Sequence, residues 1–306
     1  MRVTLVHNPG AGAQGEHDQE GLMALLREAG HTPRYVSAKD KAWKSSLDES
    51  ADVVAVAGGD GTVARVAKAM LGRDVPVAPL PAGTANNISR TLGLAGRHWE
   101  GLARAWGEAR RMKLDVGIAE GPWGSRPFVE GVGAGLFACL LSDEDPERKL
   151  AQHKPPDERV AHALAMLKKR SLDCAPLELK GTLDGEEVYG RCLLAEVLNI
   201  PYVGPNLFLA PDSKPGDGFF DVIIVTEAER DRLKNYLETW QENRERLAVL
   251  PSRRGKHLRV EWTGFELHID DELWPEEGAR PGGSGMIDLR IAGAVEFLAP
   301  DGKKPK

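Results

Sequence analysis

The chain of 306 residues is long enough for one large or two ordinary domains, each with a substantial core. Its hydrophobic fraction of 42%, charged fraction of 28% and net charge of −6 are typical of a globular protein and argue against a general nucleic-acid binder. No apolar run reaches the roughly 18 residues that span a bilayer, and the N-terminus does not resemble a signal peptide. The three cysteines lack metal-ligand spacing, so we expect buried small hydrophobes in a cytoplasmic protein.

Strand and helix signals alternate along the first third of the chain. Apolar runs predict strands at 3–7, 33–37, 53–57 and 75–80, and helical spacing predicts helices at 19–29, 63–71 and from 88 to 92. This alternation is typical of a parallel, doubly wound sheet, in which ligands bind beyond the carboxyl ends of the strands. Unusual loops at 8–12, 58–62 and 81–87 each follow a predicted strand, so we expect them to gather at that edge.

The most informative loop is Gly58-Gly59-Asp60-Gly61-Thr62, between a buried strand and a helix. Three glycines allow positive φ and a close approach of the backbone to a ligand, and the amides that begin the helix form an anion site. Asp60 would repel a phosphate unless it holds a metal, a water or a substrate hydroxyl. The loop therefore favours a catalytic role, with a helix-capping aspartate as the alternative.

From about residue 121 the pattern changes to strands with period-two alternation. These strands are predicted at 177–183, 192–199, 219–225, 258–262, 265–269 and 287–291, and Asp184-Gly185 predicts a hairpin turn. Residues 142–176 have a helical pattern, with Val160, Leu164 and Leu167 on one face. We expect an α/β domain at 1–120 and a mostly antiparallel domain at 121–293, with a last strand at about 294–306 as a candidate to return to the first.

An ordered series of motifs resembles the catalytic domain of diacylglycerol kinases and sphingosine kinases, particularly the soluble bacterial lipid kinases. The series comprises Asn8–Gly12, Gly58–Thr62, Pro81–Asn87, Asp115–Gly117, Ala210–Asp212 with Gly216–Val222, and Asp270–Glu272. The resemblance covers nearly the whole chain. It implies a nucleotide-binding domain like that of NAD kinases and phosphofructokinases, followed by a β-sandwich-like lipid-substrate domain. It also implies phosphorylation of a lipid hydroxyl, such as that of diacylglycerol, with ATP and Mg²⁺.

The resemblance assigns the nucleotide to the three loops and to one strand end. The residues are Asn8, Pro9, Gly10, Ala11, Gly12, Ser37, Gly58, Gly59, Asp60, Gly61, Thr62, Gly83, Thr84, Asn86 and Asn87. Phosphoryl transfer needs neutralisation of phosphate charge, and loop amides can supply part of it. The alternatives are a tight turn at Asn8-Pro9 and an ordinary strand-end residue at Ser37.

Among the acids, the resemblance gives catalytic roles to Asp60, Asp270 and Glu272. Asp60 is expected to organise Mg²⁺ and water, and Asp115 either joins it or is a solvated strand-end acid. Asp270 and Glu272 would share one face if the segment is extended. We favour Glu272 as acceptor of the hydroxyl proton, a role that burial would assist, with Asp270 as orienting partner or alternative base. A solvated acidic turn is the alternative.

A second metal site is implied at the loop before residue 220. By the resemblance, Asp217 and the main-chain carbonyls of Lys214 and Phe219 hold a structural Mg²⁺ that supports the second domain and takes no part in the chemistry. A loop with two glycines and one acid is equally compatible with a plain turn.

Three departures from the family pattern stand out. After the threonine the family usually has an apolar residue, then Asn, then Glu or His, whereas this chain has Val63-Ala64-Arg65. Where the family has Asn-Asp, this chain has Asn86-Asn87. Because the amide of Asn87 contributes no negative charge, Asp60 and Asp115 would have to supply the negative charge that a metal ion needs. Asp271 replaces a glycine between the two acids; if that position needs positive φ, Asp is among the better-tolerated residues.

Two other functions are compatible with the glycine loop: an NAD kinase, and a non-catalytic nucleotide- or lipid-binding module of the same fold. A soluble lipid kinase must dock transiently on a membrane, and residues 160–172 with Lys168, Lys169 and Arg170 are candidates, with a solvated helix end as the alternative. Tyr202-Val203-Gly204 is a candidate wall of the acyl-chain pocket. The identity of the lipid and the oligomeric state, with a homodimer as one option, stay open.

Overall fold

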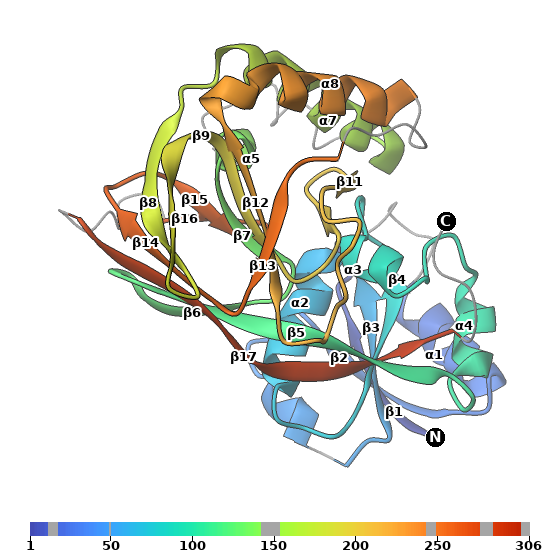
Figure 1. The fold of residues 1–306 in the computed structure, drawn as a ribbon. Coiled ribbons are helices and arrows are strands. Elements are labelled where there is room, and N and C mark those ends of the chain that lie inside the picture. Colours follow the sequence, from blue (N-terminus) through green and yellow to red (C-terminus); the bar gives the residue numbers. More distant parts are fainter. Residues whose placement is uncertain (12–17, 49, 142–153, 243–248, 276–283, 301–306) are drawn as a thin grey trace. The chain divides into compact units, whose positions relative to one another are not determined.

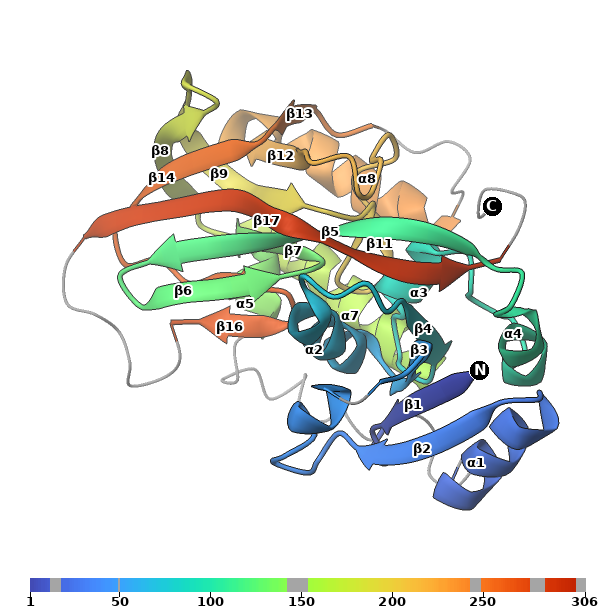
Figure 2. The same cartoon turned by 90° about the horizontal axis from the view of Figure 1, so that it is seen from below.

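The computed structural model describes residues 1–11, 18–48, 50–141, 154–242, 249–275 and 284–300 (Figures 1 and 2). They form two compact units, one of residues 1–114 with the chain from Gly293 onward, and one of residues 115–292. Two long strands, β5 (Arg110–Gly121) and β17 (Gly285–Ala299), contribute residues to both units. The division between the units therefore falls within strands, at residues 114 and 292, where sequence reasoning placed it at 120 and 293.

Parallel strands form the sheet of the first unit, in the order β2 (Thr32–Ser37), β1 (Arg2–His7), β3 (Val53–Gly58) and β4 (Val77–Pro81). Phe297 of β17 pairs in parallel with Val77 at the β4 edge. Every residue of β3 is buried, as expected for a central parallel strand covered on both faces. The predicted parallel α/β architecture is confirmed.

Helices of the first unit connect these strands. They are α1 (Gln19–Glu28), the short 3-10 helix η1 (Ser45–Asp48), α2 (Asp60–Met70), α3 (Asn87–Thr91) and α4 (Trp99–Ala105). Asp18 caps α1 by accepting a hydrogen bond from the amide of Gly21 at 2.7 Å, and Gly30 follows its end with a φ of 85°. Helix α1 packs on β2, and α2 packs on β3 and β4.

The second unit is built from antiparallel strands, as predicted. Its main path runs β16 (Glu272–Trp274), β15 (Leu267–Ile269), β7 (Gly131–Gly135), β9 (Glu186–Leu198), β8 (Leu177–Leu183), β14 (His257–Trp262) and the first part of β17. Two branches lie off this path. In one, β9 also pairs with β12 (Phe220–Thr226), which in turn pairs with β13 (Ser252–Gly255). In the other, β5 pairs with β6 (Gly124–Phe128). A separate small ribbon joins β10 (Tyr202–Val203) to β11 (Leu207–Phe208).

Two apolar clusters stabilise this unit. One lies between the strands and includes Val197, Trp262 and Leu267. The other packs Leu194 and Ile223 of the sheet against α5 (Leu136–Leu141), α7 (Pro156–Asp173) and α8 (Arg230–Glu242), and Figure 1 shows α7 and α8 side by side. The predicted apolar face of α7 is confirmed for 156–173; residues 142–153 lie outside the described residues. Among the helices that the structure describes, none is long and apolar enough to cross a bilayer.

The cysteines differ from one another in burial. Only Cys192 is buried, whereas Cys139 and Cys174 are partly exposed, which corrects the expectation of three buried small hydrophobes. The predicted hairpin turn at Asp184-Gly185 is confirmed, with both residues at positive φ, 51° and 91°, as a two-residue turn with an Asp-Gly sequence requires.

Candidate functional site

The predicted loops of the first unit do gather at one edge of the sheet. In the parallel register His7 pairs with both Ser37 and Ala57, and Gly58 pairs with Pro81. The segments that follow these residues therefore leave the sheet side by side. This edge collects the predicted nucleotide residues from Asn8, Ser37, Gly58 and Gly83 onward; Gly12 lies outside the described residues.

Two of the glycines at this edge are required by close packing and not by their backbone angles. Gly59 has a φ of −87°, and neither Gly58 nor Gly61 has positive φ, so the prediction of left-handed backbone there is wrong. A Cβ at Gly83 would lie 2.5 Å from the Cα of Gly59, and one at Gly59 would lie 2.9 Å from the Cα of Gly83. The two loops thus touch backbone to backbone, a contact that only glycine permits.

Asn8 links the first loop to the second. Its side-chain nitrogen donates to Thr62 Oγ1 at 3.2 Å, and its side-chain oxygen accepts from the amide of Gly10 at 3.1 Å. The amide of Ala11 donates to the Asn8 carbonyl at 3.0 Å, which closes a tight turn around Pro9. The turn and the link to Thr62 together hold the loop at the strand edge. A tight turn at Asn8-Pro9 is therefore compatible with a role in binding a ligand.

Asp60 does not cap its own helix. It is the first residue of α2 and is buried, and its Oδ1 accepts a hydrogen bond from the amide of Ile88 at 3.0 Å, near the start of α3. The side chain thus connects α2 with the third loop. The capping alternative raised by the sequence is wrong, because the acceptor serves a different helix.

The third loop is closed by Asn86. This residue has a φ of 53°, and its side chain accepts from the Gly83 amide at 2.9 Å and donates to the Gly83 carbonyl at 2.7 Å. Thr84 lies within this turn, and Asn87, the first residue of α3, is buried. Asn86 therefore builds the loop, which leaves ligand contacts in it to its backbone and to its neighbours.

Lys39 is a site residue that sequence reasoning missed. Its amide donates to Ser37 Oγ at 3.3 Å, and its ammonium lies 3.5 Å from the position that a Cβ at Gly10 would take. The side chain is exposed and carries a positive charge to a loop edge formed by backbone amides. A basic residue two positions after a strand end was the signal in the sequence.

In the second unit, Asp270 occupies a two-residue turn between β15 and β16. Ile269 pairs with Glu272, so Asp270 and Asp271 form the turn, and Asp270 has a φ of 52°. Its buried Oδ1 accepts from the amides of Val129 at 2.9 Å and Glu130 at 2.8 Å, with Gly131 at 3.4 Å. These amides hold the carboxylate in one orientation.

This turn corrects three expectations about the acidic segment. Asp270 and Glu272 are not alternate residues of one extended strand, because the chain reverses between them. The positive φ falls at Asp270 and not at Asp271, the residue in place of the family's glycine. Glu272 is exposed, so the burial that would assist a general base is absent there. The alternative of a solvated acidic turn holds for Asp271 and Glu272, which are exposed, and fails for Asp270, which is buried.

A buried ion pair between His268 and Glu196 binds the main chain of the turn. His268 Nδ1 lies 2.8 Å from the carbonyl oxygen of Asp270, and His268 Nε2 lies 3.0 and 3.1 Å from the two carboxylate oxygens of Glu196. Burial disfavours the charged imidazole, but the charge and hydrogen bond of Glu196 and the Asp270 carbonyl outweigh it and raise the pKa of His268 to about 9. Sequence reasoning missed this pair, whose members are 72 residues apart.

A small pocket lies against the same turn. Apolar side chains line one part of it, and polar groups line the other. The lining residues are Glu130, Gly131, Phe137, Leu140, Leu141, Val203, Gly204, His268, Asp270 and Asp271. Two residues of the predicted wall at 202–204 therefore do border a pocket, next to the acidic turn.

The predicted structural metal site has a positively charged partner from the chain itself. Asp217 Oδ1 accepts from the amide of Phe219 at 3.1 Å, and Asp217 Oδ2 forms an ion pair with Arg254, whose guanidinium lies 4.8 Å from the centre of the Phe219 ring. Among the described residues, no group of three or more His, Cys, Asp or Glu side chains is arranged to hold a metal. In this structure Arg254 therefore supplies the positive charge beside Asp217.

Asp115 belongs to the same loop system in the second unit. It is buried, and its Oδ2 accepts from the amide of Gly218 at 2.9 Å. Burial raises the pKa of this carboxyl, with the nearby charge of Asp217 acting in the same direction and the amides of Gly218 and Gly216 opposing it. The alternative of a solvated acid at Asp115 is wrong.

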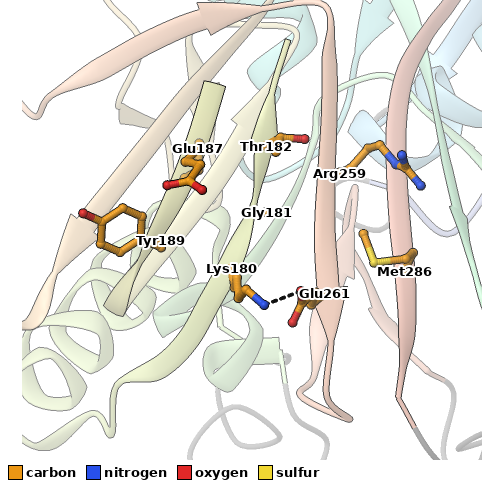
Figure 3. Close-up of a pocket in the computed structure, with 9 residues that line it drawn as sticks. Lys180, Gly181, Thr182, Glu187, Tyr189, Arg259, Glu261 and Met286 are labelled. Carbon is orange, nitrogen blue, oxygen red and sulfur yellow. Dashed lines mark ion pairs between the residues drawn. The ribbon is translucent and has the colours of Figure 1, made fainter. Parts of the chain in front are cut away.

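A larger hollow of about 610 Å³ lies on the strands of the second unit (Figure 3). Its walls come from β8, β9, β14 and β17, and Lys180 is paired with Glu261 at 2.7 Å within it. Tyr189 and Met286 border it with exposed side chains. None of the predicted site residues lines this hollow.

Comparison with known proteins agrees with the two-unit description. Residues 2–119 match the model of the diacylglycerol kinase catalytic domain, and residues 151–276 match the model described as the YegS C-terminal NAD kinase beta sandwich-like domain. The two matches include the glycine loops and the acidic turn, respectively. They define the chain as a nucleotide-binding kinase domain followed by a β-sandwich-like domain.

Curated relatives carry one name. A diacylglycerol kinase of Mycobacterium tuberculosis is 26% identical over 289 residues, covering 89% of each chain, and one of Staphylococcus saprophyticus is 25% identical over 98% of this chain and 96% of its own. Two solved structures from Bacillus anthracis, one described as a diacylglycerol kinase and one as a candidate for that activity, share the fold. Their TM-scores are 0.66 and 0.72 at 18% and 19% identity, and each covers at least 97% of both chains.

The chain carries a match to the diacylglycerol kinase catalytic domain and resembles diacylglycerol kinases over most of its length, as the sequence motifs predicted. The expected fold class and the expected class of enzyme, a lipid kinase, are confirmed with it. The comparisons give no support to an NAD kinase or to a non-catalytic module.

Proposed function

We propose that this protein transfers the γ-phosphoryl group of ATP to a hydroxyl group of a membrane lipid, with diacylglycerol as the first substrate to test. The observation that carries the proposal is Asp270, a carboxylate held by main-chain amides beside a pocket with an apolar wall. The pocket measures only about 30 Å³, so it fits the hydroxyl end of a lipid acceptor, beside apolar side chains such as Phe137 and Leu140. The named relatives support the same lipid class.

At the nucleotide end, backbone amides and one ammonium bind phosphates in our proposal. The amides at the start of α2 point from a helix N-terminus, where negative charge is stabilised. The packed pair Gly59 and Gly83 lets a phosphate approach the backbone without a side chain in the way. Lys39 adds a positive charge at the first loop. Asn8, Thr62 and Asn86 shape these loops.

Mg²⁺ neutralises phosphate charge in this class of reaction. Asp60 fits such an ion chemically, because it is a carboxylate at the loop edge whose direction is fixed by the Ile88 amide, and hard cations prefer oxygen ligands. Asp115 belongs to the other unit, where its Oδ2 accepts from the amide of Gly218, so its role as a second acidic ligand stays a prediction. Magnesium dependence with loss of activity in both Asp60→Asn and Asp115→Asn supports this prediction.

At the lipid end, two acids divide the work. Oδ1 of Asp270 is bonded to main-chain amides, so we assign Asp270 the role of orienting the hydroxyl. Glu272 begins the neighbouring strand β16 with its side chain exposed, and we assign it the role of accepting the hydroxyl proton.

Access to a lipid requires contact with a bilayer surface. Near its C-terminus helix α7 carries Lys168, Lys169 and Arg170, of which Lys169 is exposed and the other two are partly buried, and Leu172 close to them is 59% exposed. Cations beside an exposed apolar side chain fit the anionic interface of a membrane. We therefore propose that this end of α7 docks the otherwise cytoplasmic protein transiently on anionic membranes. Co-sedimentation with phosphatidylglycerol vesicles, reduced in a Lys168→Gln, Lys169→Gln, Leu172→Ser variant, tests the contact.

The structural Mg²⁺ at Lys214, Asp217 and Phe219 stays a prediction, and Arg254 competes with it. If an ion displaces Arg254, then EDTA lowers the melting temperature of the wild type. If Arg254 supplies the positive charge, EDTA has no effect on the wild type, and the variant Arg254→Ala becomes more stable when Mg²⁺ is added.

The function is tested by presenting several acceptors with radiolabelled ATP and Mg²⁺. We expect label in dioleoylglycerol dispersed in phosphatidylglycerol vesicles, no label in NAD, and loss of lipid labelling in Asp60→Ala. Unchanged labelling in that variant contradicts a catalytic nucleotide loop. Binding of ATP without label in any member of a lipid panel favours the non-catalytic module.

A further inference from the structure

We propose that His268 is a positioning residue, which fixes the Asp270-Asp271 turn through the main-chain carbonyl of Asp270 and is itself held by the buried carboxylate of Glu196. The inference rests on the proposed function, because that function gives the turn and Glu272 their roles in phosphoryl transfer. His268 does not contact the reacting atoms in this account. It acts through the geometry of the turn.

The partners of the two ring nitrogens indicate which of them donate. The Asp270 carbonyl can only accept, so His268 Nδ1 donates to it across 2.8 Å. On the other side of the ring, the Glu196 carboxylate receives Nε2 at 3.0 and 3.1 Å. An imidazole that donates from both nitrogens is the imidazolium form. One ring therefore joins strand β9 to the acidic turn by two charge-assisted hydrogen bonds.

The turn depends on these bonds because its conformation is an uncommon one. Asp270 has a φ of 52°, in the left-handed region that a non-glycine residue seldom occupies. Its amide donates to the Gly131 carbonyl at 2.8 Å and its side chain accepts from Val129 and Glu130. His268 binds the remaining main-chain polar group of the same residue. Amide, carboxylate and carbonyl of Asp270 are thus all tied to the scaffold of the second unit.

The chain makes room for the ion pair. A Cβ at Gly133 would lie 2.1 Å from a Glu196 carboxylate oxygen, so only glycine fits opposite this acid on β7. Glu196 and His268 are 0% and 2% exposed. The other groups around the ring are the charge of Asp271, the Phe137 ring of α5 at 6.4 Å, and Glu130 in the shared pocket.

A buried ion pair is weak evidence for stability in its own right, because apolar side chains of similar volume often serve as well. Its position here points to specificity: one end of the pair binds the residue whose carboxylate borders the pocket. An apolar residue at 268 would leave the Asp270 carbonyl without this donor. The expected result is a turn that can shift while the rest of the sheet keeps its fold.

Two conservative variants separate the two hydrogen bonds. In His268→Asn the side-chain amide takes the place of Nδ1 and can still donate to Asp270, whereas in His268→Gln it takes the place of Nε2 and can still donate to Glu196. We expect His268→Gln to lower kcat for dioleoylglycerol by about 100-fold, the cost of a small misplacement, with KM for ATP unchanged. His268→Asn should keep most of the wild-type kcat. Equal losses in the two folded variants, or a wild-type kcat in His268→Gln, overturn the proposal.

Hydrogen exchange supplies a readout that does not depend on activity. The amides of Val129 and Glu130 bond to Asp270, so we expect faster exchange of the 129–131 peptide in His268→Gln than in His268→Asn at equal melting temperature. If exchange is equal in the two variants, the positioning role is refuted even where activity is lost. If no lipid is phosphorylated by the wild type, the proposed function fails, and the exchange comparison still decides the role of His268.

Discussion

The nucleotide edge of the first unit and the acidic turn of the second unit achieve rigidity by different physical means. At the nucleotide edge, two glycines touch backbone to backbone, and small polar side chains such as Asn8 and Asn86 tie each loop to its neighbours. At the acidic turn, a buried ion pair and three main-chain amides hold one aspartate. The first arrangement exposes amides to a ligand, and the second presents carboxylates. In the proposed reaction the amides meet the phosphates of ATP, and the carboxylates meet the hydroxyl of the lipid.

The buried ion pair of the acidic turn predicts that removal of a charged partner costs more there than at an exposed ion pair. His268→Ala leaves the Glu196 carboxylate buried without its counter-ion, which we expect to lower the free energy of unfolding by about 3–5 kcal/mol. The matched control is His257→Ala, because His257 pairs with Asp288 at 2.8 Å on the surface, and such pairs contribute about 1 kcal/mol or less. Urea unfolding measures both, and equal losses would contradict the contrast.

At the nucleotide edge, the vulnerable feature is the contact between glycines. Gly83→Ala forces a Cβ to 2.5 Å from the Cα of Gly59, and we expect about 1–3 kcal/mol of destabilisation together with weaker ATP binding. Gly61→Ala is the control: a Cβ there meets nothing within 4 Å, and alanine is the better helix former by about 1 kcal/mol. Calorimetric titration with ATP analogues and thermal melts compare the two. Wild-type ATP affinity in Gly83→Ala would contradict the claim that the Gly59–Gly83 contact shapes the nucleotide site.

The acidic turn also predicts that the stability of the fold depends on pH. The pKa of His268 is about 9 in the folded protein and about 6.5 in an unfolded chain. Its charged form therefore stabilises the fold fully below about pH 6.5, and this contribution is lost as the pH rises through about 9. Glu196→Gln keeps a hydrogen-bond partner without the charge, so its urea midpoint should decline less between pH 6 and pH 10. Parallel declines in the two proteins would contradict this origin.

The smallest predicted effect concerns thiol reactivity next to the apolar pocket. The hydrogen bond from Cys174 lowers the pKa of Cys139 on α5 to about 7, with the charge of Arg170 acting in the same direction, whereas burial raises the pKa of Cys192 to about 11. Iodoacetamide at pH 7.5 should therefore modify Cys139 well before Cys192, because the thiolate is the nucleophile. Peptide mass spectrometry follows the order. Faster modification of Cys192 would contradict the difference in environment.

The sequence predicted the nucleotide edge well because local signals define it. Gly58, Asn8 and Pro81 each follow a buried apolar run, and parallel strands bring such positions to one edge regardless of side-chain detail. The reason for the glycines was beyond local reasoning, since Gly59 and Gly83 come into contact only when β3 and β4 pair. Lys39 was visible as a basic residue after a strand end, but its proximity to Gly10 depends on the register of β1 and β2.

The acidic turn was harder to predict because its geometry comes from long-range contacts. Asp270 bonds to amides about 140 residues earlier in the chain, and His268 meets Glu196 across 72 residues. No periodicity in the sequence marks such a pair. Helix α8 was not predicted, although it carries a local signal: Leu233, Tyr236, Leu237 and Trp240 follow helical spacing and are all buried.

The central claim is that Glu272, directly after the acidic turn, accepts the proton of a lipid hydroxyl, and one comparison with the preceding residue tests it most directly. Glu272→Gln removes the proposed base, while Asp271→Asn removes an equally exposed charge one residue away. The account predicts that kcat for dioleoylglycerol falls by about 10²–10⁴-fold in Glu272→Gln and is nearly unchanged in Asp271→Asn. Equal activity of Glu272→Gln and the wild type, with both proteins folded, would contradict the account.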